Sequence, residues 1–336
     1  MSQCPRLDRR GFLSSSLAAA GAAGAILGAE TPGSVRAGEE PAKTPEPKPA
    51  ADAHGMPCGM LGKAKISRLM LGGNLVTGCM HARDLHYVTR LFRAYVTEEK
   101  MMETFKVAEE HGVNTVFESG ADFVQRNNQK FNGHMQFIPS IHPDVGLDEQ
   151  RLKDEIKHFV NAGAAALYTW GVVSDKLVKI GAVDVLARAV ELAKASGLAV
   201  GVGGHSLQVP MACEKAKVPC DFYVKTLHRD DYPSAVPPEL RKDFIWLEGG
   251  KGFYDNMWCI HPQEVIDFMA TVTKPWIAFK VLAAGAILPR QGFPHAFGGG
   301  ADFIAVGMFD FQIKENCELV RKVVDREQRR SRPWRA

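Results

Sequence analysis

The sequence lacks several features that would assign it to a class at once. Its 336 residues carry a formal net charge of only +3, so no strong attraction to nucleic acid is expected. No Cys-x-x-Cys pair and no zinc-like spacing of cysteine and histidine is present. No Gly-x-Gly-x-x-Gly follows the first predicted strand, which argues against a doubly wound dinucleotide-binding sheet.

A strongly apolar run of about 20 residues, as a membrane span requires, is also absent. The N-terminal run from Phe12 to Leu27 is shorter and rich in Ala, Gly and Ser. It follows Arg9-Arg10 and precedes a candidate cleavage site at Val35–Ala37, which is the order of a secretory signal. Asp8–Leu13 resembles the twin-arginine export motif. The resemblance implies export by the twin-arginine machinery to the periplasm or cell exterior, with no membrane span left after processing.

Composition divides the chain into four parts. Residues 1–37 are the predicted signal peptide. Residues 38–57 are rich in Pro, Ala, Glu and Lys without apolar periodicity, which predicts a flexible linker. Residues 58–326 form the predicted folded domain, and residues 327–336 form a basic tail that we expect to be solvated.

Six cysteines follow the predicted signal. An even number in an exported protein suggests disulfides. The twin-arginine resemblance, however, implies folding in the reducing cytoplasm, and a large domain has enough core to need no disulfides. We therefore expect mostly free, buried thiols at Cys58, Cys79, Cys213, Cys220, Cys259 and Cys317.

Short apolar stretches alternate with amphipathic helical stretches along the folded domain. Eight strand-then-helix units predict a single closed (β/α)8 TIM barrel, an α/β fold. Several of the strands are nearly continuous apolar runs, as in strands buried on both faces. The predicted strands are Arg68–Asn74, Thr115–Ser119, Met135–Ile141, Ala165–Val172, Leu198–His205, Phe222–His228, Trp276–Ala283 and Phe303–Met308.

The predicted helices include Glu98–Glu110, Asp148–Asn161, Val183–Ala195 and Glu315–Arg326. The crossover Ala121–His134 is short for a helix and is the least regular unit. Segments 78–96 and 229–262 are long insertions after strands one and six. Both are expected at the C-terminal face, where barrel enzymes build their sites.

Two lysines interrupt apolar strands, Lys225 in strand six and Lys280 in strand seven. Burial and a neighbouring cation both lower the pKa of a lysine, which makes the amine a nucleophile toward carbonyl carbon. The alternative is that both lysines are structural and form ion pairs with Glu118 or with Asp230 and Asp231.

The same segments carry a family resemblance. Asp221–Thr226 and Phe279–Ile287 resemble the lysine-bearing strands of deoxyribose-phosphate aldolase-like class I aldolases, and Gly300–Gly307 resembles their last strand. The resemblance implies that Lys225 is the Schiff-base nucleophile and that Lys280 modulates its pKa.

We therefore predict a lyase or isomerase acting on a small carbonyl or sugar-derived compound, with His228 or Glu118 moving protons. Strand parity places Lys225 and His228 on opposite faces unless strand six ends or twists between them. The residues expected to bind substrate are Asn74, His205, Asp230, Gly285, Gly307 and Trp258.

A second hypothesis uses the strand-end imidazoles. Glu118, His142, His205 and His228 come from four strands, and converging at the mouth they would bind a divalent metal with an open position. The enzyme would then be a metal-dependent hydrolase, lyase or isomerase. No cofactor is predicted beyond this optional metal.

A second resemblance covers the N-terminal units. Leu61–Gly73 and Val107–Thr115 resemble the opening of aldo-keto reductases, which use an Asp at the end of strand two, a Tyr soon after it, and a Lys on strand three. Here Glu118 replaces the Asp, and neither the Tyr nor the Lys follows. The resemblance thus leaves a third hypothesis, a barrel without that catalytic set that acts as a binding protein for a sugar or a partner.

Overall fold

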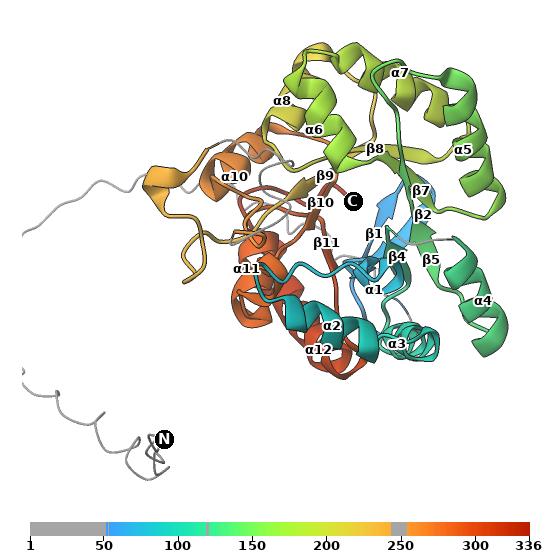
Figure 1. Ribbon diagram of the computed structural model, residues 1–336, viewed down its shortest axis with the longest axis vertical. Helices are drawn as coiled ribbons and strands as arrows, with labels where there is room; N and C mark the ends of the chain where they lie inside the picture. The colour runs from blue at the N-terminus through green and yellow to red at the C-terminus, as the bar shows by residue number, and fades with distance from the viewer. Residues whose placement is uncertain (1–51, 53, 119–120, 243–253) are drawn as a thin grey trace, which may run out of the picture. The chain divides into compact units, whose positions relative to one another are not determined.

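The computed structural model describes residues 52, 54–118, 121–242 and 254–336. The predicted signal and most of the predicted linker lie outside these residues. The described chain forms a parallel nine-stranded sheet in the order β5-β4-β3-β11-β10-β9-β8-β7-β6, surrounded by helices (Figure 1). The predicted α/β barrel is confirmed.

The nine strands make eight barrel staves because β5 and β6 are one predicted strand divided at Pro139. Pro139 has no N–H to donate, so the ladder is interrupted there. β5 pairs with β4 and β6 pairs with β7, which closes the ring. The strands are β3 (Leu69–Gly72), β4 (Thr115–Phe117), β5 (Gln136–Ile138), β6 (Ser140–Ile141), β7 (Ala166–Thr169), β8 (Ala199–Gly204), β9 (Phe222–Thr226), β10 (Trp276–Phe279) and β11 (Phe303–Val306).

Helices cover the outside of the barrel (Figure 1). The least regular unit does form a helix, α4, over Ala121–Phe131. Segment 78–96 contributes α2. The remaining bounds are α1 (Asn74–Thr77), α2 (His86–Tyr95), α3 (Glu98–Glu110), α5 (Glu149–Asn161), α6 (Gly171–Lys179), α7 (Val183–Lys194), α8 (Gln208–Ala216), α10 (Pro262–Thr271), α11 (Pro289–Gly298) and α12 (Asp310–Arg326), with 3-10 turns η1 (Pro238–Leu240), η2 (Ala283–Gly285) and η3 (Glu327–Arg329).

The two faces of each strand belong to different cores. In β9, Phe222 and Val224 pack inside the barrel, whereas Tyr223 packs in the layer between strands and helices. Gly201 of β8 gives the Phe222 ring its space, since a Cβ at Gly201 would lie 2.4 Å from that ring. This alternation decides which side chains of β9 can reach the mouth.

A hairpin closes the N-terminal end of the barrel, which we call the base. Its strands are β1 (Cys58–Leu61) and β2 (Ala64–Ser67), and Leu61 and Ile66 pack into the barrel interior. The predicted linker therefore ends earlier than expected, because Met56 is already fully buried in the core.

The tail 327–336 also belongs to the base, which corrects the expectation of a solvated terminus. Arg330 and Arg332 are buried and form ion pairs of 2.9 and 2.8 Å with the two carboxylate oxygens of Asp302. The same oxygens accept from the backbone N–H groups of Trp276 and Arg335. Both oxygens of this buried carboxylate thus accept hydrogen bonds from an arginine and from a backbone N–H group.

Most of the barrel strands end earlier than the sequence predicted. Glu118 and Lys280, each expected to lie in a strand, have φ values of 60° and 59° just after β4 and β10. A positive φ turns the chain out of the sheet. Glu118, expected at the end of a strand, and Lys280, expected within one, therefore both lie in the loops of the mouth.

The six cysteines of the described chain are free; Cys79 is exposed and the other five are buried. This confirms the expectation for thiols. Among the described residues, none of the helices combines the length and apolar character needed to cross a bilayer.

Candidate active site

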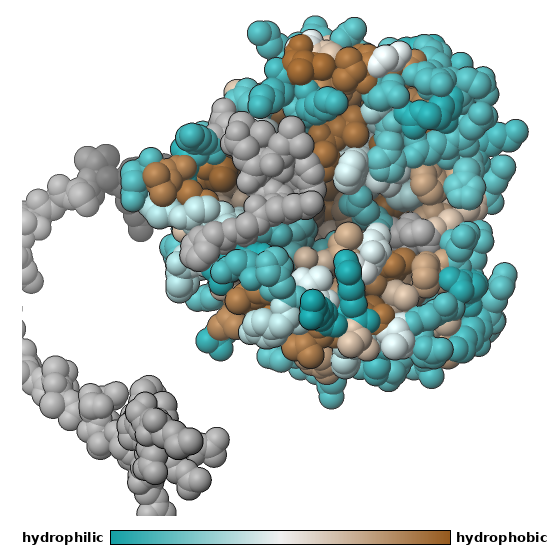
Figure 2. All heavy atoms as spheres, viewed as in Figure 1, coloured by the Kyte–Doolittle hydropathy of each residue, from teal (hydrophilic) through white to brown (hydrophobic). Residues whose placement is uncertain are grey.

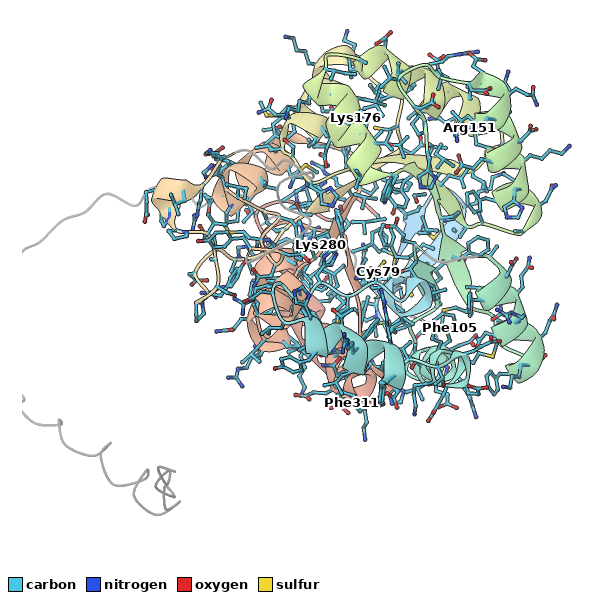
Figure 3. All side chains as sticks on the ribbon, in the orientation of Figure 1. Cys79, Phe105, Arg151, Lys176, Lys280 and Phe311 are labelled. Carbon is cyan, nitrogen blue, oxygen red and sulfur yellow. The ribbon has the colours of Figure 1, made fainter. Side chains whose placement is uncertain are left out.

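A cavity of about 510 Å³ opens at the C-terminal ends of the barrel strands. Apolar and aromatic side chains, among them Phe117, Tyr168 and Phe279, form most of its wall. Its titratable side chains come from several strands and loops: Cys79, His81, Glu118, Tyr168, His205 and Lys280. Figure 3 shows Lys280 and Cys79 in the middle of the barrel, within the ring of helices.

Lys280 is linked to an imidazole and a carboxylate. Its Nζ lies 2.8 Å from Nε2 of His81, and Nδ1 of His81 lies 3.0 Å from Oδ1 of Asp255. Because the carboxylate only accepts, Nδ1 of His81 carries the proton and Nε2 accepts from the lysine. The three groups thus form a chain of amine, base and orienting carboxylate.

Burial lowers the pKa of Lys280 to about 8, against opposing effects of Asp255 and Glu118. The Nζ atom also lies 4.0 Å from the centroid of the Trp258 ring, a cation–π contact that favours the charged form. Burial lowers the pKa of His81 as well, with Lys280 adding to the effect. With a pKa of about 8, about half of the amine is uncharged at pH 8.

Glu118 faces the same cavity from the end of β4. Its Oε2 accepts a 2.5 Å hydrogen bond from the Tyr168 hydroxyl, and its Oε1 accepts a 3.3 Å bond from Ser140. Burial, followed by the charge of Glu118, raises the pKa of Tyr168 well above its ordinary value. Tyr168 is therefore a protonated donor, and Glu118 is the acceptor at this position.

His205 is positioned by a buried carboxylate on α6. Its Nδ1 lies 2.7 Å from Oδ2 of Asp175, and Asp175 also accepts from the backbone N–H groups of His205 and Ser206. Burial lowers the pKa of His205, while the bond to Asp175 raises it. The imidazole lines the cavity in a fixed orientation.

The structure does not place Lys225 in the cavity, which corrects the role expected of it. Lys225 has the parity of Tyr223, on the helix-facing side of β9, and is fully buried. Its Nζ donates to the carbonyl and the hydroxyl of Thr226, at 2.9 and 2.7 Å. Burial, rather than Lys280, is the main cause of its lowered pKa.

Both ring nitrogens of His228 likewise form hydrogen bonds with the backbone. Its Nδ1 bonds to the carbonyl of Arg229 at 2.7 Å, and its Nε2 accepts from the backbone N–H groups of Trp258 and Cys259 at 3.0 and 2.9 Å. Burial lowers its pKa to about 4. His228 therefore fixes the segment that brings Asp255 and Trp258 to Lys280, and it has no nitrogen available for acid–base chemistry.

Most of the residues predicted to bind substrate lie together at the cavity. Five of them line the cavity: Asn74, His205, Gly285, Gly307 and Trp258. Asp230 does not, because it forms an ion pair with Arg241. Glu118 and Lys280, predicted as catalytic, also line it.

The predicted metal ligands do not converge. His142 lies outside the cavity and bonds to Glu155 at 2.6 Å, while His205 is paired with Asp175 and His228 with the backbone. Within residues 52, 54–118, 121–242 and 254–336, no three His, Cys, Asp or Glu side chains are grouped to hold a metal ion.

His81 and Asp255 were not predicted as site residues. Both belong to the insertions 78–96 and 229–262, which were expected at the mouth. No periodicity orients a side chain in such loops. The useful signal was their composition, since a histidine and an acidic, aromatic-rich stretch lie in the two longest insertions.

No protein-family model matches this chain, and none of the curated proteins matches it in sequence. Among solved structures it is similar to a putative aldo-keto reductase from Pseudomonas aeruginosa, with 14% identity, a TM-score of 0.51, and coverage of 82% of this chain and 97% of that one. It is also similar to a truncated 3-deoxy-D-arabino-heptulosonate 7-phosphate synthase from Thermotoga maritima, with 11% identity, a TM-score of 0.42, and coverage of 84% and 91%. A putative deoxyribose-phosphate aldolase from Coccidioides immitis has 11% identity, a TM-score of 0.38, and coverage of 62% and 76%. At 14% identity the likeness to the putative aldo-keto reductase shows the fold alone, in agreement with the TIM barrel described above.

Proposed function

We propose that this protein is a barrel enzyme of lyase or isomerase type that acts on a small carbonyl compound through a Schiff base on Lys280. The observation that carries the proposal is the chain Lys280–His81–Asp255 at the wall of a cavity. A nucleophile within hydrogen-bond reach of a base that is itself oriented by a third group is the arrangement of covalent catalysis.

In the proposed reaction the uncharged Lys280 amine attacks the carbonyl carbon and a C–N bond forms. The amine proton passes to Nε2 of His81, whose Nδ1 proton remains on the bond to Asp255. The carbonyl oxygen leaves as water, taking up the proton that the amine passed to His81 and a second proton from solvent, and an N–H iminium remains. The iminium then accepts the electron pair of a neighbouring C–C or C–H bond, which breaks.

Glu118 is the group we assign to proton transfer at the neighbouring carbon. It lines the cavity with Lys280, and its charge raises the pKa of that lysine. The bond from Tyr168 holds the carboxylate in place.

A second candidate is reduction of a carbonyl by an external hydride donor. It is favoured by one observation, namely that Tyr168, Glu118 and Lys280 line one cavity although the Tyr and Lys come from other strands than in aldo-keto reductases. The raised pKa of Tyr168 and its bond to Glu118 oppose proton donation to substrate. Oxidation of NADPH with a carbonyl substrate would separate this candidate from the first.

Borohydride trapping tests the Schiff base. The protein is incubated at pH 8 with glyceraldehyde, dihydroxyacetone, pyruvate or benzaldehyde, reduced with cyanoborohydride, digested and mapped by mass spectrometry. We expect one dominant adduct, at Lys280. Lys280→Met should abolish it, whereas Lys225→Met should leave it in place, since Lys225 lies outside the cavity.

Two results would overturn the proposal. One is trapping no faster at Lys280 than at exposed Lys176. The other is equal adduct formation in the Lys280→Met variant. Binding of these carbonyls without any adduct would favour a binding protein instead.

We also propose that the chain is exported, on the resemblance of Asp8–Leu13 to the twin-arginine motif. Replacing Arg9 and Arg10 by Lys in the full chain should retain the protein in the cytoplasm of a twin-arginine-competent host. Export of this variant at the normal rate would contradict the proposal.

A further inference from the structure

Helix α2 presents apolar side chains to solvent. Tyr87 and Leu91 are each 64% exposed and Tyr95 is 39% exposed. Residues four apart share a helix face. Phe92, on another face, is 7% exposed and packs in the core. Tyr87 and Leu91 are therefore not the side chains that bind α2 to the barrel, whereas Tyr95 also donates from its hydroxyl to Asp310 of α12 at 2.6 Å.

The apolar surface continues onto the start of α12. Phe311 is 69% exposed, and its ring lies 6.3 Å from that of Tyr95. Phe311 also stacks at 5.4 Å on Phe309, and Phe309 lines the cavity. We call Tyr87, Leu91, Tyr95 and Phe311 the α2 strip. It is thus continuous with the aromatic wall of the cavity.

Basic residues flank the α2 strip. Arg90 and Arg93 are exposed, and neither forms an ion pair with another residue of the described chain. The sequence of α2, HYVTRLFRAY, contains no acidic residue. In Figure 2, strongly hydrophilic residues stand beside brown and pale ones over the region of α2.

We propose that the α2 strip docks onto an anionic lipid surface. Aromatic and leucine side chains beside arginines, on a short helix with one apolar and one basic face, are the composition of interfacial helices. Tyrosine is also the residue that membrane–water boundaries favour. Arg90 and Arg93 would lie at the phosphate groups while Tyr87 and Leu91 enter the headgroup region.

The positive charges of Arg90 and Arg93 disfavour a second copy of the chain as the partner that covers the α2 strip. A two-fold contact through α2 would bring two copies of Arg90 and Arg93 together with no acid on either copy of α2 to offset them. Asp310, the acid beside the α2 strip, already accepts from Tyr95 and pairs with Lys100. The docking does not depend on the proposed Schiff-base chemistry. It would place the mouth of the cavity beside the lipid, because Phe309 joins the α2 strip to the cavity wall.

Vesicle co-sedimentation of the full chain tests the proposal. We expect binding to phosphatidylcholine vesicles that contain about one third phosphatidylglycerol, and little binding to phosphatidylcholine alone. Arg90→Gln with Arg93→Gln should weaken partitioning about 25-fold, at about fivefold for each arginine near an anionic surface. Tyr87→Ser with Leu91→Ser should abolish binding, and about 1 M salt should weaken it strongly.

Helix α6 offers matched controls, since Lys176 and Lys179 are exposed and Ile180 is 54% exposed. In Figure 1, α6 and α2 lie at opposite sides of the ring of helices. Lys176→Gln with Lys179→Gln, and Ile180→Ser, should leave vesicle binding unchanged.

The proposal is overturned if the protein ignores anionic vesicles, or if the α6 variants reduce binding as much as the α2 variants. It is also overturned if light scattering shows a dimer that Leu91→Ser dissociates, because the α2 strip would then join two copies.

Discussion

The charged side chains at the two ends of the barrel differ in how completely they are paired. At the base, Asp302 carries a full set of partners and pairs with Arg330 and Arg332. At the mouth, Lys280 faces a neutral imidazole, and its carboxylate partner Asp255 is one residue further away. Removing one partner of a fully paired buried charge destabilises a fold, and a charge that is left partly uncompensated is available for chemistry.

The largest expected effect lies at the base. Asp302→Asn would leave Arg330 and Arg332 buried without a carboxylate, which costs about 3–5 kcal/mol of unfolding free energy. Urea unfolding measures it. The matched control is Asp231→Asn, whose partner Arg229 is exposed, and it should cost no more than about 1 kcal/mol. Equal losses for the two variants would remove the distinction between base and surface.

Removing the charge at the mouth should raise the free energy of unfolding, whereas removing the charge at the base lowers it. The pKa of Lys280 is lowered from 10.5 to about 8, so the folded protein is penalised below pH 8 and the penalty disappears as pH rises through 10.5. Lys280→Met should therefore stabilise the protein at pH 7 by on the order of 2 kcal/mol and eliminate activity. Unfolding measured between pH 7 and pH 10 checks the sign. A loss of stability at pH 7 would show that the ammonium is well compensated.

His228 tests whether the segment 254–261 sets the properties of Lys280. His228→Phe leaves the backbone N–H groups of Trp258 and Cys259 without an acceptor, which costs about 2 kcal/mol. Loosening this segment should also let water reach Lys280 and raise its pKa above about 8. His228→Gln keeps an acceptor and should recover part of both effects. A lysine pKa unchanged in His228→Phe would mean that the segment does not control it.

The smallest effect is expected for His142, which is half-exposed and lies outside the cavity. His142→Ala should change the unfolding free energy by less than about 1 kcal/mol and leave carbonyl trapping unchanged. The metal hypothesis makes the contrary prediction, namely that loss of His142 abolishes activity. Metal analysis of both proteins, prepared without chelator, would accompany the measurement.

The periodicity of the sequence predicted the fold well because it follows from burial. A strand that packs on both faces must be apolar along its length, and eight such runs with helices between them close into a barrel. The same reasoning could not locate strand ends. Lys280 and Glu118 leave their strands through a positive φ, which residue type alone does not indicate.

Part of the site could be predicted because strand topology alone brings some residues to the mouth. Lys280, Glu118 and His205 directly follow strands, so topology places them at the mouth. Lys225 lies within β9, where the alternation of side chains turns it toward the helices. The residues that complete the site, His81 and Asp255, come from loops whose paths depend on tertiary contacts.

The most direct measurement is the titration of Lys280 itself. Incorporation of 13C-labelled lysine followed by NMR of the Cε carbons gives the pKa of each unmodified lysine, and the Lys280→Met variant assigns the signal. The account predicts that one lysine of the cavity titrates near pH 8 and moves when a carbonyl compound is added. A signal for Lys280 at its ordinary pKa of 10.5, insensitive to carbonyl compounds, would contradict it.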